Sequence, residues 1–358
     1  MKRFLIIQTA FLGDAVLVTS ILEKLHAHYP DAAIDLVVRK GNEGLFTGHP
    51  FLRKLFVWDK RTAKNKALFK LISELRRAQY DHIINCQRFF STGLMTVLAR
   101  GKEKVGYDKN PLSFLFSRTV KHVIGDPSTP LRLRSGQALR VTPHEVDRLN
   151  ALIEPLTDGQ RPMPRLYPTA EDRAKIDGIL RSNGLSCNGL HEHMTTWAHE
   201  RMSYVCIAPA SVWFTKQWPE HKWIELVKAL PRDQQVFIIG APGDTALAQR
   251  IIAASGRGVD LTRELKLLES AALMEGATMN YVNDSAPLHI ASAMNAPVTA
   301  IFCSTVPAFG FGPLRENGRV LETPEKLDCR PCGLHGHKAC PKGHFKCAEE
   351  IAVKILPS

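Results

Sequence analysis

The sequence predicts an α/β protein made of two doubly wound domains with a cleft between them. Short runs of β-branched residues alternate with longer segments of helical spacing along all 358 residues. This alternation is typical of parallel sheets with helices on both faces. It occurs in two successive sets of about 150 residues each, and the chain is longer than one ordinary hydrophobic core can serve.

Strands and helices are placed by β-branched runs and by apolar residues three and four positions apart. In the first half, strands are expected at 3–8, 34–38, 54–58, 82–86, 104–107 and 120–124, and helices at 14–30 and 65–79. In the second half, strands are expected at 204–209, 235–240, 258–262, 279–284 and 297–302, and helices at 221–230, 245–255, 265–277 and 287–295.

A linker is expected between residues 150 and 200, because 155–172 is rich in proline and polar residues. Residues 126–142 and 186–203 have no clear periodicity and are interpreted as inserted loops. The expected domains are 1–165 and 203–340, separated by a linker and insert at 166–202 and followed by a terminal segment at 341–358.

The composition favours a globular protein without a membrane span. Hydrophobic residues make up 44% of the chain and charged residues 23%. No stretch approaches about 18 uninterrupted apolar residues, and the N-terminus lacks the form of a signal peptide. Eight cysteines in a chain of this length favour free thiols in a reducing compartment, so we expect a cytosolic protein.

The whole net charge of +12 lies in the first 150 residues. They contain 25 Lys and Arg against 13 Asp and Glu, whereas residues 151–358 contain 22 of each. Such a one-sided field concentrates an anionic partner: nucleic acid, an acidic membrane or a phosphorylated lipid. An ordinary basic surface with no partner is the alternative.

Asp14 is the first candidate for a functional group. Ligands of open parallel sheets bind at the carboxyl ends of strands, and Asp14 follows the first expected strand. Gly13 beside it allows a tight backbone turn. The alternative is a structural role, because an acidic residue is favoured in the first turn of a helix.

The loop 208–223 follows the first strand of the second half and offers Ser211, Thr215 and Lys216. A lysine with hydroxyl groups at a strand end suits a phosphate. A surface lysine between buried tryptophans is the alternative.

Asp284 and Ser285 stand at the end of another strand and at the entry to a helix. His289 lies one turn further along, on the same face as Ser285. The exposed N–H groups of such a helix start form a natural phosphate site. Asp and Ser are also ordinary N-cap residues, so the pair alone indicates little.

The C-terminal part of the chain is rich in cysteine and histidine. Its spacing C-x2-C-x7-C-x6-C, made by Cys329, Cys332, Cys340 and Cys347, could close a tetrahedral zinc site. His335, His337 and His344 lie among them. Only one C-x2-C knuckle is present, so free thiols are the alternative.

Three motifs are absent, and their absence narrows the chemistry. No G-x-G-x-x-G follows a strand and no G-x-x-x-x-G-K-[ST] occurs, which disfavours dinucleotide oxidoreductases and P-loop enzymes. No two aspartates stand two positions apart, so a D-x-D clamp for a metal and a diphosphate is missing. A bound nucleotide diphosphate would have to be neutralised by Lys216 and helix N-termini.

Five stretches resemble, in the same order, those of the ADP-heptose:lipopolysaccharide heptosyltransferases, glycosyltransferase family 9. They are GDAVLVTS at 13–20, APASVWFTKQWP at 208–219, GAPGD at 240–244, NDSAPLHIASAM at 283–294 and the cysteine-rich tail. HEVDR at 144–148 is similar to the segment before the linker in that family. The resemblance spans nearly the whole chain. It implies a GT-B fold of two Rossmann-like domains, an N-terminal one for the acceptor and a C-terminal one for the donor, with a last helix that packs back on the N-terminal domain.

The resemblance also implies roles for individual residues. Asp14 matches the proposed catalytic base, and Lys216 matches the lysine that contacts the donor diphosphate. Asp244 would hold the ribose. The resulting donor-binding set is Ser211, Thr215, Lys216, Asp244, Asp284, Ser285, Ala286 and His289.

The chain departs from the family pattern where Ala286 replaces the usual glycine and Val212 replaces a second hydroxyl. These departures affect the identity of the donor and the acceptor more than the assignment to the family.

The resemblance therefore implies an inverting, metal-independent transfer of heptose from ADP-heptose to the inner core of lipopolysaccharide. Catalysis would need no cofactor, and zinc would be structural. We expect a monomer, peripheral on the cytoplasmic face of the inner membrane, that binds a phosphorylated core acceptor and no nucleic acid. The alternatives are a GT-B glycosyltransferase with another nucleotide-sugar and a lipid or glycan acceptor, and a basic nucleic-acid-binding protein, which predicts aromatic residues interleaved with the basic runs.

Overall fold

The structure, a computed structural model, describes residues 1–60, 64–124, 131–132, 138–139, 143–185, 202–314 and 318–355. The chain divides into two compact units, Met1–Tyr167 and Pro168–Ser358. Most of each expected insert, 126–142 and 186–203, lies outside the described residues.

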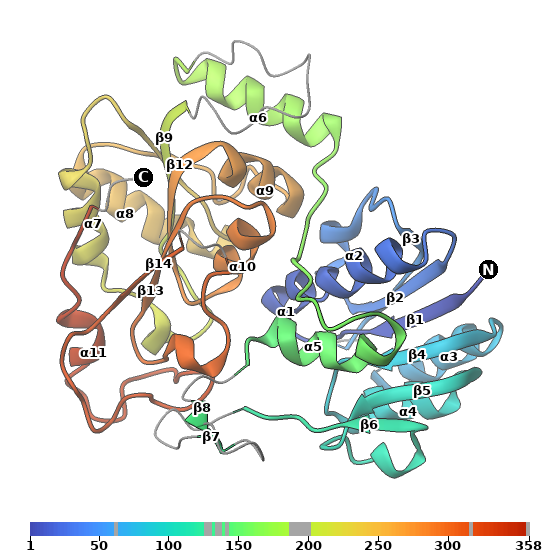
Figure 1. Ribbon diagram of the computed structural model, residues 1–358. Helices are drawn as coiled ribbons and strands as arrows, with labels where there is room; N and C mark the ends of the chain where they lie inside the picture. Colours follow the sequence, from blue (N-terminus) through green and yellow to red (C-terminus); the bar gives the residue numbers. More distant parts are fainter. Residues whose placement is uncertain are drawn as a thin grey trace. The chain divides into compact units, whose positions relative to one another are not determined.

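The first unit is a parallel six-stranded sheet with helices on both faces (Figure 1). The strand order is β3-β2-β1-β4-β5-β6, and every neighbouring pair is parallel. In chain order the elements are β1 (Arg3–Ile7), α1 (Leu12–Leu17), α2 (Thr19–His28), β2 (Ala33–Arg39), η1 (Glu43–Phe46), β3 (Leu52–Trp58), α3 (Lys64–Arg76), β4 (Tyr80–Asn85), α4 (Phe90–Leu98), β5 (Gly101–Tyr107), η2 (Ser113–Leu115), β6 (Arg118–Val120), β7 (Leu131–Arg132), β8 (Ala138–Leu139), α5 (Glu145–Ile153) and η3 (Glu154–Leu156).

Helices cover the faces of this sheet in pairs. α3 packs against α4, and α2 packs against α5 (Figure 1). The core beneath α3 and α4 includes Leu5, Trp58, Leu71, Ile83 and Met95. Because both faces of a doubly wound sheet are covered, β1 and β2 are buried along nearly their whole length, which explains their continuous apolar sequence.

The helix expected at 14–30 is broken into α1 and α2. At the break, the Thr19 hydroxyl donates to the carbonyl of Val16, and the Ser20 hydroxyl donates to the carbonyl of Leu17, each at 2.7 Å. Hydroxyl groups that bond to the preceding turn compete with the helical backbone and favour such a break. α1 is therefore a short helix of six residues directly after β1.

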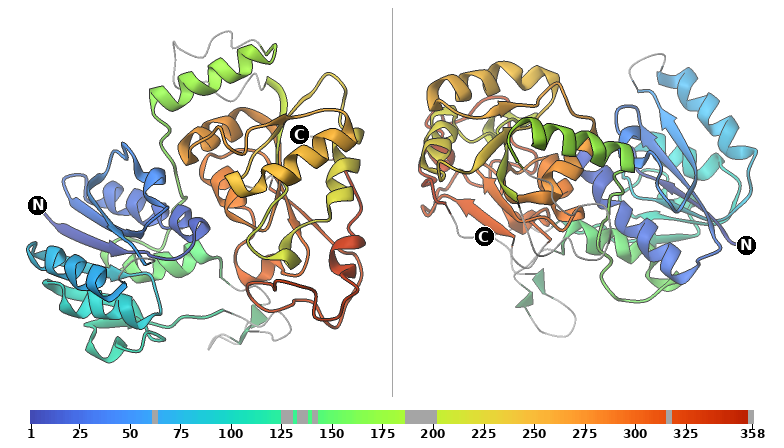
Figure 2. Two further views of the ribbon diagram at one scale, coloured as in Figure 1. Left: turned by 180° about the vertical axis from the view of Figure 1, so that it is seen from behind. Right: turned by 90° about the horizontal axis from the view of Figure 1, so that it is seen from above.

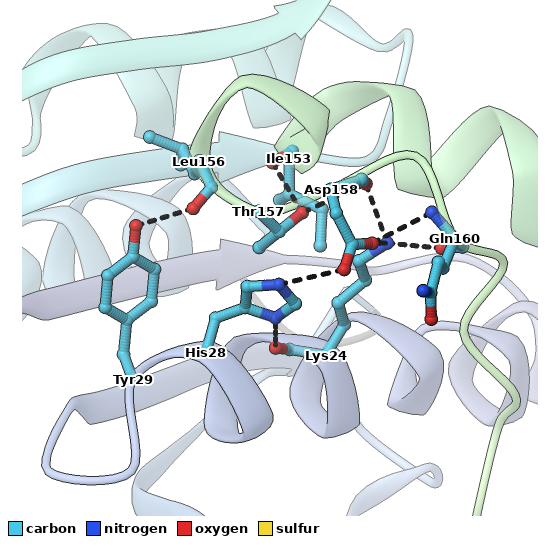
Figure 3. Close-up of polar contacts among 8 residues, drawn as sticks. All are labelled: Lys24, His28, Tyr29, Ile153, Leu156, Thr157, Asp158 and Gln160. Carbon is cyan, nitrogen blue, oxygen red and sulfur yellow. Dashed lines mark hydrogen bonds and ion pairs between the residues drawn. The ribbon is translucent and has the colours of Figure 1, made fainter.

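A network around Lys24 ties α2 to the segment that follows α5 (Figure 3). The Lys24 ammonium donates to the carbonyls of Asp158, at 2.8 Å, and of Gln160, and it pairs with the Asp158 carboxylate at 2.6 Å. His28 approaches the same carboxylate at 3.1 Å, and the Tyr29 hydroxyl donates to the carbonyl of Leu156 at 2.5 Å. These bonds hold the end of α5 against α2.

The second unit repeats the arrangement with strand order β11-β10-β9-β12-β13-β14, again with all neighbours parallel. Its elements are α6 (Ala170–Ser182), β9 (Met202–Ala208), η4 (Phe214–Lys216), α7 (Glu220–Ala229), β10 (Gln235–Ile238), η5 (Pro242–Asp244), α8 (Thr245–Ser255), β11 (Val259–Asp260), α9 (Leu267–Gly276), β12 (Ala277–Asn283), α10 (Ala286–Ala293), β13 (Val298–Phe302), η6 (Pro307–Phe309), β14 (Arg319–Glu322) and α11 (Lys346–Glu349). Helices α7 and α8 pack side by side (Figures 1 and 2).

The two sheets confirm the predicted fold class of doubly wound α/β units. Several elements differ from the sequence prediction. β6 begins at Arg118 rather than at residue 120, while α4, α5, α6 and β14 were not predicted as elements. α6 lies in residues interpreted as linker. Its N-terminus carries a capping box, in which the Thr169 hydroxyl accepts from the N–H of Asp172 and the Asp172 carboxylate accepts from the N–H of Thr169.

Within 341–355, the described part of the terminal segment, the only helix is the four-residue α11. Ala348 and Ile351 lie in the core of the second unit, together with Trp218 and Trp223. A contact of this segment with the N-terminal domain stays a prediction.

Among the described residues, no helix combines the length and the apolar character needed to cross a bilayer.

We predict that Lys24→Met lowers the free energy of unfolding by about 1–3 kcal/mol, because the carbonyls of Asp158 and Gln160 and the Asp158 carboxylate lose a charged donor. Urea denaturation followed by circular dichroism measures this change. Lys70→Met, at an exposed position of α3, is the matched control and should stay within about 0.5 kcal/mol of the wild type. Equal stability of both variants would show that the network contributes nothing.

Candidate active site

Asp14 lies in the first turn of α1, at the carboxyl edge of the first sheet. Asp14 as a whole is partly exposed to solvent, but its carboxyl group is surrounded by protein atoms. Burial, the larger cause, and the negative charge of Glu145 together raise the pKa of the Asp14 carboxyl to about 7. Hydrogen bonds from the backbone and the positive Arg148 oppose the increase. Asp14 is therefore a carboxylate that can take up a proton near neutral pH.

Glu145 and Arg148 form a buried ion pair on α5, with side chains only 8% and 4% exposed. The Arg148 guanidinium donates to the Glu145 carboxylate at 2.7 Å and to the carbonyl of Pro143 at 2.6 Å. Desolvation raises the pKa of Glu145, although the ion pair opposes this. Both residues lie at the start of α5, where a capping box between His144 and Asp147 fixes the first turn of the helix. The first turn therefore holds both charges in place beside Asp14.

In the second unit, the loops after β9, β12 and β13 meet at the carboxyl edge of the sheet. Lys216, which ends η4, pairs with the Asp284 carboxylate at 2.7 Å. The same Asp284 oxygen accepts from the Thr305 hydroxyl at 2.6 Å. The side chains of Lys216 and Asp284 are only 15% and 7% exposed, so this ion pair is largely shielded from solvent. The Asp284 carboxylate thus holds the lysine ammonium in a fixed position.

Asn283 joins the β9 loop to the β12 loop. Its amide oxygen accepts from the N–H of Trp218 at 3.0 Å, and its amide nitrogen donates to the carbonyl of Pro209 at 2.8 Å. Within the β9 loop, Gln217 donates to the carbonyl of Ser211 at 2.6 Å. These bonds fix the backbone on both sides of Lys216.

Thr215 connects the β9 loop to β13 and to the C-terminal tail. Its hydroxyl accepts from the N–H of His337 at 2.7 Å and bonds the Ser304 hydroxyl at 3.0 Å. A Cβ atom on Gly336, whose φ is +75°, would lie 2.9 Å from the Thr215 hydroxyl and 3.0 Å from Cγ of Lys216. Only glycine permits this close approach of the tail at that backbone conformation.

The start of α10 contains three of the predicted donor-binding residues, Ser285, Ala286 and His289. Ser285 is the N-cap residue, and Ala286 is the first residue of the helix. Burial, opposed by the negative charge of Asp284 and reinforced by Lys216, lowers the pKa of His289 to about 4. His289 is therefore neutral at pH 7. Its Nδ1 has no hydrogen-bond partner within the part of the chain that the structure describes.

Asp244 ends η5 after β10, next to β9 in the sheet. Its carboxylate accepts from the N–H of Ala241 at 2.7 Å and so caps its own turn. The structure thus brings Thr215, Lys216, Asp284 and their loops into contact, whereas Asp244 is engaged locally.

The cysteine-rich tail packs against these loops. The Arg330 guanidinium donates to the carbonyls of Phe302, Cys303 and Thr305, and the N–H of Cys332 donates to the carbonyl of Ser304 at 2.7 Å. The tail thus supports the end of β13 and the Thr215 loop.

The four tail cysteines of the predicted zinc site, Cys329, Cys332, Cys340 and Cys347, are all free thiols. Cys329 approaches His344, with 3.8 Å between Sγ and Nε2. Among the described residues, no three Cys, His, Asp or Glu side chains are arranged to hold a metal ion. The zinc site stays a prediction.

Two features of the site were not predicted from the sequence. Glu145 and Arg148 lie within the HEVDR segment but were given no electrostatic role. Ser304 and Thr305 lie two and three residues after the end of β13, so the rule that ligands bind at strand ends would have selected them.

Comparisons with known proteins identify the family of the chain and relatives that share its fold. The model of glycosyltransferase family 9 (heptosyltransferase) matches residues 68–338. Lipopolysaccharide heptosyltransferase 3 of Escherichia coli strain K12 is 26% identical over 323 residues, which cover 85% of this chain and 83% of that protein.

Two solved structures share the fold. The glycosyl transferase family 9 protein from Veillonella parvula DSM 2008 superimposes with a TM-score of 0.73 at 21% identity, covering 90% of this chain and 86% of the other. E. coli heptosyltransferase WaaC with ADP-2-deoxy-2-fluoro heptose gives a TM-score of 0.65 at 21% identity, covering 90% and 93%.

We predict that Asp14→Asn is more stable than the wild type at about pH 8 and loses this advantage towards about pH 4. The pKa of Asp14 is about 7 in the folded state and 3.8 ordinarily, so between these pH values the folded state binds the proton more tightly than the unfolded state. The stability of the wild type therefore falls as the pH rises through this range. Asn removes this dependence. Thermal unfolding across the pH range measures it, with the exposed Asp31→Asn as control. A difference that does not change with pH would contradict the raised pKa.

Proposed function

The chain belongs to glycosyltransferase family 9, the heptosyltransferases, and on this premise we propose that it transfers heptose from ADP-heptose to the inner core of lipopolysaccharide with inversion and without a catalytic metal. The observation that carries the proposal is Lys216, held by the Asp284 carboxylate, which also accepts from Thr305, where three loops meet at the carboxyl edge of a Rossmann-like unit. The names of relatives support the donor: they include lipopolysaccharide heptosyltransferases and a transferase solved with an ADP-heptose analogue.

Asp14 is proposed as the general base. Near neutral pH a carboxyl with a pKa of about 7 is partly ionised and still basic enough to accept a proton efficiently. It takes the proton of an acceptor hydroxyl as that oxygen forms a bond to the anomeric carbon. The bond from this carbon to the diphosphate oxygen breaks on the opposite face, so the configuration inverts and ADP leaves with the electron pair.

The second unit is proposed to stabilise the departing diphosphate. Lys216 supplies a positive charge, and the start of α10 at Ser285 and Ala286 supplies the positive end of a helix dipole. His289, neutral because its pKa is about 4, can donate a hydrogen bond without adding charge. Asp284 keeps Lys216 oriented instead of contacting a phosphate itself. Ser211, Thr215 and Asp244 are proposed to shape the rest of the donor site.

The acceptor side is proposed to be the basic first unit. The core of lipopolysaccharide is phosphorylated, and the surplus of Lys and Arg in residues 1–150 would concentrate such an anion. We accordingly propose a monomer that is peripheral on the cytoplasmic face of the inner membrane, attracted by charge.

Two variants separate the proposed roles of base and donor ligand. Asp14→Asn should reduce heptosyl transfer by at least about 100-fold while ADP affinity stays unchanged. Lys216→Met should weaken ADP binding by about 1–3 kcal/mol, and the exposed Lys228→Met is its control. Mass spectrometry of a heptose-free core acceptor measures transfer, and calorimetry measures ADP binding. Transfer by Asp14→Asn at the wild-type rate, or stronger binding of UDP or GDP than of ADP, would contradict the proposal.

Metal dependence tests the mechanism separately. The chain lacks a D-x-D clamp, and Lys216 supplies the neutralising charge instead, so transfer should survive incubation with a chelator. An absolute requirement for Mg²⁺ would overturn this mechanism. Elemental analysis of untreated protein tests the structural zinc predicted from Cys329, Cys332, Cys340 and Cys347: stoichiometric zinc supports it, and reactive thiols without zinc refute it.

A further inference from the structure

Two loops of the first unit expose four large apolar side chains. Phe89 and Phe90, at the start of α4, are 60% and 57% exposed. Phe114 and Leu115, in η2, are 77% and 50% exposed. We call residues 87–90 and 108–115 the aromatic loop pair.

The buried side chain of Asn110 ties the two loops together. Its amide nitrogen donates to the carbonyls of Gln87, at 3.2 Å, and Phe89, at 3.0 Å, while its amide oxygen accepts from the N–H of Leu112 at 3.0 Å. A Cβ on Gly93 of α4 would lie 2.3 Å from the same oxygen. The backbone beneath the exposed rings is therefore held rigidly, and the two pairs of apolar side chains are presented from one support.

These side chains lie outside the packed core beneath α3 and α4. Folded proteins rarely leave large apolar side chains clustered in water, and a cluster rimmed by polar residues marks a binding surface. Both loops follow strands of the sheet, β4 and β5, so they stand near its carboxyl edge.

The charge around the loop pair is positive. The two loops contain the cations Arg88 and Lys109 against one acid, Asp108, and Lys121 follows them in the chain. Lys109 and Lys121 are exposed, and Arg88, directly before Phe89, is partly exposed. Asp108 is the opposing exposed acid, and it accepts from the N–H of His122 at 2.9 Å. Apolar side chains surrounded by cations fit a surface that offers anionic headgroups above an apolar layer.

We propose that the aromatic loop pair docks the first unit on an anionic lipid bilayer. The four apolar side chains enter the boundary between headgroups and acyl chains, and Lys109, Lys121 and Arg88 contact lipid phosphates. The proposal rests on the proposed function, because it names the surface through which a transferase with a membrane-embedded acceptor would reach it.

The test measures binding of the whole protein to sucrose-loaded vesicles by sedimentation, in low salt. Vesicles of equimolar phosphatidylglycerol and phosphatidylcholine should bind the protein, and vesicles of phosphatidylcholine alone should bind it much more weakly. Phe89→Ser/Phe90→Ser and Phe114→Ser/Leu115→Ser should each reduce the partition coefficient by at least about tenfold. Their circular dichroism spectra and thermal unfolding should match those of the wild type, which shows that the first unit folds.

Two further variants sharpen the result. Phe69→Ser removes a phenylalanine of α3 that is 58% exposed, and it should bind vesicles like the wild type. Phe89→Leu/Phe90→Leu keeps apolar surface without rings, and it should retain vesicle binding. Loss of vesicle binding in this leucine variant would contradict entry of the apolar side chains into the bilayer and would overturn the proposal. Equal binding by both serine variants and the wild type, or equal loss with Phe69→Ser, would overturn the proposal.

Vesicle binding needs neither donor nor transfer, so its failure is distinct from failure of the proposed function. A protein that binds no vesicles but transfers heptose to a soluble core acceptor refutes only the docking surface.

Discussion

The parallel order of the strands is the constraint on which the site depends. In each unit all six strands of the main sheet run the same way, so their carboxyl ends meet at one edge. Asp14 reaches that edge in the first unit because α1 begins directly after β1. In the second unit, the loops after β9, β12 and β13 reach it together. Residues far apart in sequence, such as Lys216 and Thr305, thereby share one carboxylate, that of Asp284.

The two units use buried charge in opposite ways. In the first, Asp14 stands near a second carboxylate, Glu145, and both burial and repulsion make its ionised form costly. That cost makes the carboxyl a better base at neutral pH. In the second unit, Lys216 forms an ion pair with Asp284, which holds the positive charge in place. A bound diphosphate would bring negative charge next to this ion pair. Its affinity then depends on how far its attraction to Lys216 exceeds its repulsion by Asp284.

Much of the fold could be predicted because local patterns carry it. Strand β1 and helix α3 follow directly from runs and spacing of apolar residues. The break between α1 and α2 escaped notice because Thr19 and Ser20 bond to the preceding turn, which apolar spacing does not register. Asp14 and Lys216 were found from the rule of strand ends and from the family resemblance. The environment of Asp14 was not, because Glu145 lies more than 130 positions away and only the packing of α5 brings its charge near.

We propose that Asp14 is the base and that the charge of Glu145 adds to the effect of burial in raising its pKa. The pH dependence of heptosyl transfer at saturating donor, in the wild type and in Glu145→Gln, tests it most directly. The account predicts that the wild-type rate falls below an apparent pKa of about 7, and that this pKa moves to lower pH in the variant because a repelling charge is gone. An acidic limb that stays in place, or that moves to higher pH, would contradict the account.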